Sequence, residues 1–378
     1  MKTIKKNDPR LAYPRIFNLR PIFNEVSKGC CADSDFMEEE CFLDDYYGTL
    51  YSCSDLKHKN VYGVSNQMKY YDCMGPDEKK YEIIDELRVP FRKIPIYKVS
   101  NNDQAKSIID SVKKYNPDYQ ILFRGQGKCY TIHRSDKEKE LLYGDSAVKE
   151  PSFLSSHSRP DIDLDEKFLI NLWNWQGRFL LESLSVKMRA RLSDDDYFEF
   201  LCSKMGIEGT TLLSYFSLGM AQHYGLPSVG LDLTDNFSTA ICFASNSFKG
   251  DADNNLNVKK NENFNDSMIY VFRCPKNAVF SYASIKPNFF PKCRPDCQNA
   301  WFGNVGWGLA KNHMALYLAC CIKVTENMYA EIAPNFVKTL FPSSKDDPVL
   351  AHFLRMKNDK HNHPLVQKVF SRIYDVND

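Results

Sequence analysis

The residue types able to do chemistry are concentrated between positions 221 and 245, in the run AQHYGLPSVGLDLTDNFSTAICFAS. Polar groups at this density rarely serve packing alone, and functional side chains are usually displayed on loops by a rigid scaffold. The run is therefore the first candidate for a functional site. Its candidate residues are Gln222, His223, Tyr224, Asp232 and Thr234.

A second candidate position is the end of the apolar segment 119–124, YQILFR, which predicts a strand. Arg124 is its last residue, and the sequence Gly-Gln-Gly follows at Gly125, Gln126 and Gly127. A strand that ends in this way presents a guanidinium group and free backbone amides at a loop mouth. Such a site suits a phosphate or a carboxylate.

The local sequence also predicts the elements that position these side chains. Gly225 and Pro227 indicate a turn, residues 230–234 a short strand, and residues 237–244 a helix. Asp235 or Asn236 is the expected N-cap of that helix. In this order of turn, strand, turn and helix, the candidate side chains lie at or beside loop edges.

Hydrophobic periodicity predicts the remaining elements. Strands are expected at 268–274 and 316–324, and helices at 99–115, 165–192, 194–200, 210–220 and 326–340. The polar, Asn-rich residues 249–266 predict a disordered or mobile surface loop. The fold class is α/β or α+β, with a curved mixed sheet and helices packed on it. Residues 1–80 are predicted to be an N-terminal extension of unspecified fold, and residues 81–378 the main domain, with its core at 95–355.

Composition limits the functional classes. The chain has 378 residues, 43% of them hydrophobic, which is enough for a full globular core. Its net charge of +1 indicates no general attraction to nucleic acid or to an anionic membrane, so a nucleic-acid partner would need a local basic patch. No apolar run approaches the length of a membrane span, and the N-terminus lacks the apolar core of a signal peptide. Thirteen cysteines without a paired framework favour a reducing cytoplasm.

A metal site is not predicted. Neither the N-terminal cysteine cluster nor the pair at 293 and 297 has the paired spacing of structural zinc sites. No cluster of histidine and carboxylate residues with ligand spacing is visible, so metal-dependent hydrolysis is the least favoured reaction. The residues considered are Cys30, Cys31, Cys41, Cys53, His58, Cys73, Cys293 and Cys297.

Together these motifs resemble the FRG domain family, named for its Phe/Tyr-Arg-Gly motif. The AQHYGLP element is the most specific part of the resemblance, which covers roughly residues 95–355. The sequence departs from the family pattern after the turn, where Ser228 to Leu233 lack the usual arginine and tryptophan, and at Ala300, where glycine is usual. The matching residues are Phe123 to Gln126, Pro151 to Phe153, Ala221 to Pro227, Leu231, Asp232, Thr234, Arg294, Gln298, Phe302 and Thr339 to Pro342.

The resemblance implies a bacterial or phage protein of conflict or defence, and the order of the motifs is similar to that of ADP-ribosyltransferases. NAD is then the expected substrate, and no other cofactor is required. Arg124 would hold the phosphate or ribose, Thr234 would support it, and His223 or Tyr224 would contact the nicotinamide or ribose. Gln298 would occupy the third position, where an amide cannot supply negative charge, so Asp232 would do so instead. Further binding residues would be Gly125, Gln126, Gln222 and Arg294.

The sequence also leaves open a non-catalytic function and purely structural roles for the candidate residues. The chain is alternatively a non-catalytic sensor that binds a nucleotide, a nucleic-acid end, or a phage or host protein. Arg124 and Asp232 could form a buried ion pair that only fixes the fold. His223 could be a structural histidine, Tyr224 an amphipathic wall residue, and Gln298 a hydrogen-bonding tie between loops.

Overall fold

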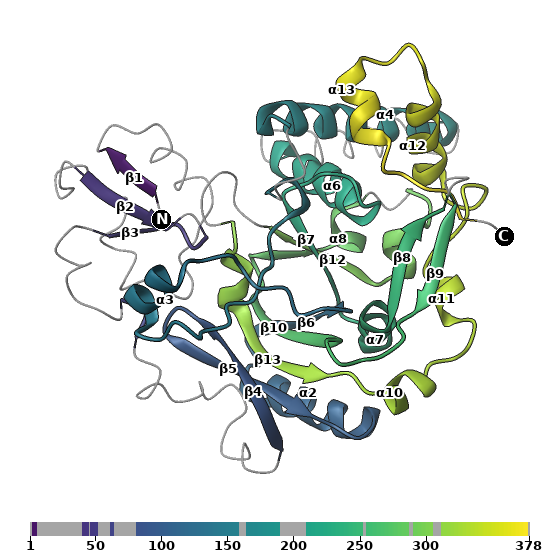
Figure 1. Cartoon of the computed structure of the whole chain (residues 1–378). Coiled ribbons are helices and arrows are strands. Elements are labelled where there is room, and N and C mark those ends of the chain that lie inside the picture. The colour runs from purple at the N-terminus through teal and green to yellow at the C-terminus, as the bar shows by residue number, and fades with distance from the viewer. Residues whose placement is uncertain are drawn as a thin grey trace.

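The computed structural model of the chain, shown in Figure 1, describes ten segments. They are residues 2–5, 40–44, 46–51, 61–63, 81–158, 164–189, 209–251, 255–286, 290–304 and 311–376. The predicted helix at 194–200 lies outside them, as do Cys30, Cys31, Cys53, His58 and Cys73. Within these segments, no helix combines the length and the hydrophobicity that a membrane span requires.

A large mixed sheet forms the centre of the described structure (Figure 1). Its strand order is β11-β12-β7-β6-β10-β13-β5-β4, and neighbours are antiparallel except for the parallel pair β13 and β5. A mixed sheet with several packed helices agrees with the α+β class predicted from the sequence. The strands are β4 (Glu82–Val89), β5 (Arg92–Lys98), β6 (Tyr119–Gln126), β7 (Gly230–Thr234), β10 (Met268–Pro275), β11 (Val279–Ser281), β12 (Ala300–Asn304) and β13 (Leu318–Lys323).

The core lies on both faces of this sheet because side chains alternate along each strand. In β6, Ile121 and Phe123 pack against the helices of one face, whereas Leu122 joins the cluster on the other. In β10, Ile269 packs on the same face as Ile121 and Phe123, and Tyr270 packs on the other face with Leu122. The helices of the first face are α2 (Asn102–Tyr115), α7 (Phe237–Ser245) and α10 (Glu326–Ala330), and the second face is covered in part by α3 (Asp136–Tyr143).

A third cluster joins the helices drawn at the top of Figure 1. Trp173 is its centre, in edge contact with Phe370 and bonded through its indole nitrogen to the carbonyl of Pro227 (2.7 Å). This bond ties the helical layer to the turn that carries the first candidate run. The helices of this layer are α4 (Glu166–Arg189), α6 (Gly209–His223), α12 (Pro348–Asn358) and α13 (Pro364–Phe370). The short helix α8 (Tyr282–Ile285), drawn beside β12, adds Tyr282 and Ile285 to the same cluster. Shorter helical segments elsewhere are η5 (Ser156–Ser158), α9 (Arg294–Cys297), η6 (His313–Tyr317) and α11 (Phe336–Thr339).

Several predicted elements are confirmed, and three need correction. The strand at 230–234 and the helix that begins at Phe237 under the N-cap Asn236 are as predicted. The predicted helix 326–340 is divided into α10 and α11, because Pro334 cannot continue a helix. The predicted loop at 249–266 instead contains a hairpin of β8 (Asn246–Gly250) and β9 (Leu256–Lys260). The strand predicted at 316–324 is shorter, since η6 occupies its first residues.

Part of the predicted N-terminal extension packs into the main core. Asp44, which ends β2, is fully buried and forms an ion pair with Arg134 (2.8 Å), which also pairs with Glu150. The hydroxyl group of Tyr62 donates to Asp44 and that of Tyr143 donates to Glu150. One arginine thus joins carboxylates on either side of the predicted boundary at residue 80. The strands of this region are β1 (Lys2–Lys5), β2 (Glu40–Asp44) and β3 (Thr49–Tyr51).

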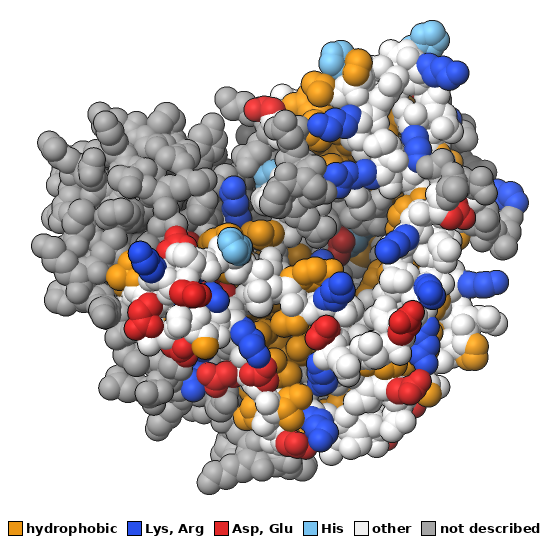
Figure 2. Space-filling model, viewed as in Figure 1, with side chains coloured by type: hydrophobic (Ala, Val, Ile, Leu, Met, Phe, Trp, Pro, Cys, Tyr) orange, Lys and Arg blue, Asp and Glu red, His pale blue; other side chains and the backbone are white. Residues whose placement is uncertain are grey.

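The surface charge is uneven on the face shown in Figure 2. Basic and acidic side chains are interspersed over the lower part of this face, as the net charge of +1 suggests. Around α12 and α13, at the upper right, the coloured charges are mostly Lys and Arg. A chain of nearly balanced charge can therefore still present a basic region.

We expect acid to destabilise the fold through His313. Burial lowers the pKa of His313 from 6.5 to about 4, and its Nε2 lies 2.7 Å from the hydroxyl group of Tyr317. The unfolded chain binds a proton at His313 first as the pH falls, so stability is complete above pH 6.5 and is lost towards pH 4. The protonation of His313 alone lowers the free energy of unfolding by about 3 kcal/mol over this range.

Urea unfolding between pH 7 and pH 4 measures this effect. His313→Gln keeps a polar partner for Tyr317 but removes the titrating group, so its stability should fall less steeply with acid. An identical pH dependence in the variant and the parent would contradict the assignment.

Candidate functional site

The candidate site lies where two central strands separate. β6 pairs with β10 along its whole length, but among the residues of β6 and β7, all of which are described, only Phe123 and Thr234 pair with each other. Because no other residues of β6 and β7 pair with each other, the two strands diverge from this point. Arg124 follows the paired residue of β6, and Asp232 lies two residues before the paired residue of β7.

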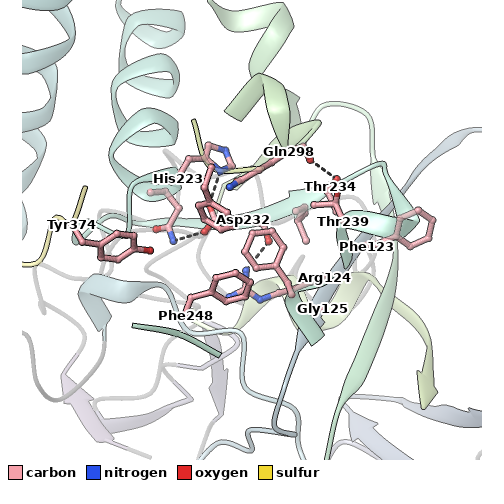
Figure 3. Close-up of a pocket in the computed structure, with 15 residues that line it drawn as sticks. Phe123, Arg124, Gly125, His223, Asp232, Thr234, Thr239, Phe248, Gln298 and Tyr374 are labelled. Carbon is pink, nitrogen blue, oxygen red and sulfur yellow. Dashed lines mark hydrogen bonds and ion pairs between the residues drawn. The ribbon is translucent and has the colours of Figure 1, made fainter. Parts of the chain in front are cut away.

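A cavity of about 190 Å³ occupies this divergence (Figure 3). Seven of the ten site residues predicted from the sequence line it, and they come from β6, β7, the end of α6 and the turn after α9. The tertiary structure thus gathers motifs that are separated by up to 174 positions in the sequence, from Arg124 to Gln298. The seven are Arg124, Gly125, Gln222, His223, Asp232, Thr234 and Gln298.

The carboxylate of Asp232 is held in place from one side. Its Oδ1 lies 3.1 Å from Nδ1 of His223, and its Oδ2 accepts a hydrogen bond from Nε2 of Gln222 (3.2 Å). Both partners belong to the last turn of α6. The side chain of Asp232 is nevertheless 38% exposed. A fixed carboxylate therefore faces the cavity.

The side chain of Arg124 contacts the main chain of Asp232 and not its carboxylate. Its Nη1 donates to the carbonyl oxygen of Asp232 (2.6 Å), across the gap between β6 and β7. The sequence left open a side-chain ion pair between the two residues, and the observed bond instead uses the peptide group. Consequently the guanidinium group bridges the diverging strands, while the carboxylate of Asp232 faces His223 and Gln222.

The electrostatic setting keeps His223 neutral near pH 7. Burial lowers the pKa of His223 below 6.5, Asp232 acts in the opposite direction, and the charges of Arg294 and Arg124 lower the pKa further. Its Nδ1 faces Asp232, which favours the tautomer with the proton on Nδ1. Nε2 is buried and has no hydrogen-bond partner among the described residues. In this tautomer Nε2 is an acceptor without a partner among the described residues, and its burial also closes it off from solvent.

Thr234 and Gln298 fix the turns around the cavity. The hydroxyl group of Thr234 donates to the carbonyl oxygen of Gln298 (2.8 Å) and accepts from the main-chain nitrogen of Asn236 (3.0 Å). The side-chain amide of Gln298 donates to the carbonyl oxygen of Leu340 (3.1 Å). Thr234 therefore binds the α9 turn and not Arg124, contrary to the role that the resemblance implied. Gln298 ties loops together, as the simpler interpretation of the sequence had it.

The backbone around Arg124 differs from the predicted loop mouth. β6 continues through Gly125 and Gln126, which pair with Ile269 and Met268 of β10. A Cβ atom at Gly125 would lie only 1.8 Å from the carbonyl oxygen of Ala240 in α7. The glycine is therefore required for the close contact between β6 and α7. Gln126 is not among the residues that line the cavity.

Tyr224 and Arg294 lie behind the cavity wall. Both are 1% exposed, and the guanidinium group of Arg294 stacks over the ring of Tyr224 at 4.7 Å. The hydroxyl group of Tyr224 and the main-chain nitrogen of Arg294 both donate to the carboxylate of Asp347, at 2.5 and 2.9 Å. Asp347 is also the N-cap of α12. This cluster anchors α12 and does not line the cavity.

Sequence reasoning missed the aromatic wall of the cavity. Phe243, Phe248 and Phe341 contact one another with ring centroids 5.1 to 6.0 Å apart, and the ring of Tyr374 completes the wall. These rings come from α7, the β8 strand, the end of α11 and the C-terminal segment. Phe341 lies in a recognised motif and Phe243 in the first candidate run, but neither was proposed for the site. Phe248 and Tyr374 had no signal because each sits alone in a separate segment.

Comparisons with models of protein families, with curated proteins and with solved structures gave no match to this chain. The site therefore has to be interpreted from its own geometry. Among the described residues, no group of three or more His, Cys, Asp or Glu side chains is placed to hold a metal ion. What the cavity offers is a fixed carboxylate, a guanidinium group, a neutral imidazole and aromatic rings.

Proposed function

We propose that this chain binds a nucleotide of the NAD type in the cavity and acts on it as an FRG-domain, ADP-ribosyltransferase-like enzyme of bacterial or phage conflict. The observation that supports this most is the partly exposed carboxylate of Asp232, held by His223 and Gln222 beside Arg124. A cation-like centre at a ribose requires a preformed negative group, and a side chain that is already positioned supplies it without reorganisation.

Each remaining feature has a part in this proposal. The aromatic rings of Phe248, Phe341 and Tyr374 suit the face of a nicotinamide ring. His223 keeps the carboxylate of Asp232 in position, since its Nδ1 lies 3.1 Å from Oδ1. Arg124 faces the oxygens of the phosphate or ribose. Asp232 supplies the negative charge beside the ribose, which Gln298 cannot supply because it is an amide.

The size of the cavity limits what it accommodates. Drug-sized ligands usually occupy pockets of roughly 300 to 1,000 Å³, and this cavity measures about 190 Å³. A ring with its ribose is therefore a better match than a whole dinucleotide. The reacting half of the nucleotide belongs in the cavity, and the other half lies outside it.

A second candidate function is binding without catalysis, and the geometry of Gln298 favours it. Its buried amide is engaged with Leu340, so the third motif contributes no charge to the cavity. A sensor module for a nucleotide, a nucleic-acid end, or a phage or host protein would need only Arg124, His223 and the aromatic wall. The two functions differ in whether the bound nucleotide is consumed.

Incubation of the purified chain with NAD and cell lysate, followed by measurement of free nicotinamide, tests the proposal. We expect release by the parent and loss of release in Arg124→Ala, because the arginine faces the phosphate or ribose. NAD should raise the melting temperature of the parent by mass action but not that of Arg124→Ala. Arg178→Ala, at an exposed arginine of α4, is the matched control and should behave like the parent.

Two outcomes would contradict the proposal that the chain is an enzyme. Without nicotinamide release, even in the presence of phage components, a rise in melting temperature with NAD would favour the sensor module. If NAD neither reacts nor raises the melting temperature, both forms of the proposal fail.

A further inference from the structure

Tyr374 differs from the other rings of the cavity wall because it carries a polar group. Phe243, Phe248 and Phe341 offer only apolar surface, whereas Tyr374 adds a hydroxyl group at the tip of its ring. The side chain is partly buried, and this hydroxyl group has no hydrogen-bond partner among the described residues. Figure 3 shows the hydroxyl end of Tyr374 directed into the pocket, towards the side on which Asp232 is drawn. It is therefore a donor that a ligand in the cavity can use.

The main chain is fixed on both sides of Tyr374. Before it, Nζ of Lys357 donates to the carbonyl oxygen of Ile373 (2.6 Å), and Ile373 itself is 1% exposed. After it, the carbonyl oxygen of Asp375 accepts from the main-chain nitrogen of Leu256 in β9 (2.7 Å). These two bonds together determine the point at which the ring of Tyr374 enters the cavity.

The carboxylate of Asp375 gives this segment a further attachment, outside the cavity. Its Oδ2 accepts from the hydroxyl group of Ser344 (2.8 Å), and its Oδ1 accepts from the main-chain nitrogen of Ser344 (3.2 Å). Hydrogen bonds to an ionised carboxylate are stronger than those between neutral groups. Neither residue lines the cavity, but each follows closely on one that does, Asp375 on Tyr374 and Ser344 on Phe341. The pair therefore joins two segments of the aromatic wall.

The ring of Tyr374 is also held directly. The guanidinium group of Arg294, which is 1% exposed, lies over this ring at 5.7 Å from its centroid, within the range of a cation–π contact. A side chain that is already fixed loses little further conformational freedom when a ligand binds. Tyr374 is therefore preorganised to contact a ligand.

We propose that Tyr374 is a specificity-determining residue of the proposed reaction, whose hydroxyl group donates to a ribose oxygen of the bound nucleotide. Ser344 and Asp375 are positioning residues that act through Tyr374. This inference rests on the proposed function, in which Asp232 lies beside the ribose and the aromatic rings lie beside the nicotinamide. A hydroxyl group at the tip of one of these rings, directed towards the side of Asp232, then meets the ribose.

Tyr374→Phe tests the role of the hydroxyl group, because it removes that group and keeps the ring. We expect the KM for NAD and the Kd of nicotinamide riboside to rise about two- to tenfold, as the loss of one neutral hydrogen bond predicts. The effect should fall on KM more than on kcat, because the ribose is bound in the ground state as well as in the transition state. The matched control is Tyr130→Phe, at a tyrosine that is 53% exposed and does not line the cavity. It should behave like the parent.

A double-mutant cycle tests the positioning role of Asp375. Asp375→Ala removes both bonds from Ser344 and should raise the KM for NAD about two- to tenfold. In a Tyr374→Ala background the same change should have no further effect on KM, because its influence passes through the ring. Ser344→Ala, which removes only the hydroxyl bond, should give a smaller increase. The control Asp346→Ala removes a neighbouring exposed carboxylate and should leave KM unchanged. Melting temperatures verify that each variant is folded.

The remaining outcomes separate the inference from the proposed function. If the parent releases nicotinamide and Tyr374→Phe has the same KM and the same Kd, the inference is wrong while the proposed function stands. If Asp375→Ala raises KM equally with and without the tyrosine ring, Asp375 does not act through Tyr374 and the positioning role is overturned. If the parent neither binds NAD nor releases nicotinamide, the proposed function fails and the inference fails with it.

Discussion

Replacement of Asp232 by asparagine is expected to slow nicotinamide release from NAD by on the order of 100- to 1,000-fold. The carboxylate is the partly exposed negative group that faces the cavity beside Arg124, and the amide keeps its size but not its charge. Near pH 7 His223 is neutral because burial lowers its pKa, so it does not depend on Asp232 for charge balance. The fold should therefore tolerate the change, and the rate constant measured at saturating NAD should carry most of the effect.

Two measurements separate this expectation from a merely structural role for Asp232. Thermal unfolding should differ little between Asp232→Asn and the parent, since the side chain is 38% exposed. Asp110→Asn removes an exposed carboxylate from α2, which does not line the cavity, and should retain full activity. An active Asp232→Asn variant would rule out Asp232 as the stabilising carboxylate, whereas an inactive and unfolded one would point to a structural role.

Replacement of Arg134 by methionine should lower the free energy of unfolding by about 3 to 5 kcal/mol. Its guanidinium group pairs with Asp44 and Glu150, and all three side chains are 1% exposed. Removing the arginine leaves two carboxylates buried together without a cation. Burial already raises the pKa of Glu150, and Arg134 opposes that rise, so the variant should lose still more stability as the pH increases through the range in which Glu150 ionises.

Urea unfolding at pH 7 measures the loss, and two further variants interpret it. Arg178→Met makes the same substitution at an exposed position and should cost less than about 1 kcal/mol. Adding Asp44→Asn and Glu150→Gln to Arg134→Met removes the stranded charges and should recover much of the lost stability. If the neutralised triple variant is as unstable as Arg134→Met, loss of packing explains the effect and unpaired charge does not.

Local sequence signals predicted the elements that form the site. Gly225 and Pro227 indicated the turn, the apolar alternation around Asp232 indicated β7, and Asn236 was among the expected caps of α7. These signals are local because turns, caps and periodicity depend on residues a few positions apart. The same reasoning placed Arg124 on the strand β6, and the resemblance to the FRG domain family implied that it shares one site with His223, Asp232 and Gln298.

The contacts of these residues could not be predicted in this way, because partners far apart in the sequence leave no local pattern. Arg124 binds the carbonyl oxygen of Asp232 only because β6 and β7 diverge after a single pair of residues. The sequence of neither strand predicts that divergence. Tyr374 reaches the cavity from the last segment of the chain, and Asp44 crosses the predicted boundary at residue 80 to meet Arg134. Burial set the neutral state of His223 for the same reason. A side chain's solvent exposure depends on the whole fold, whereas the residue type alone supplies only its capacity for chemistry.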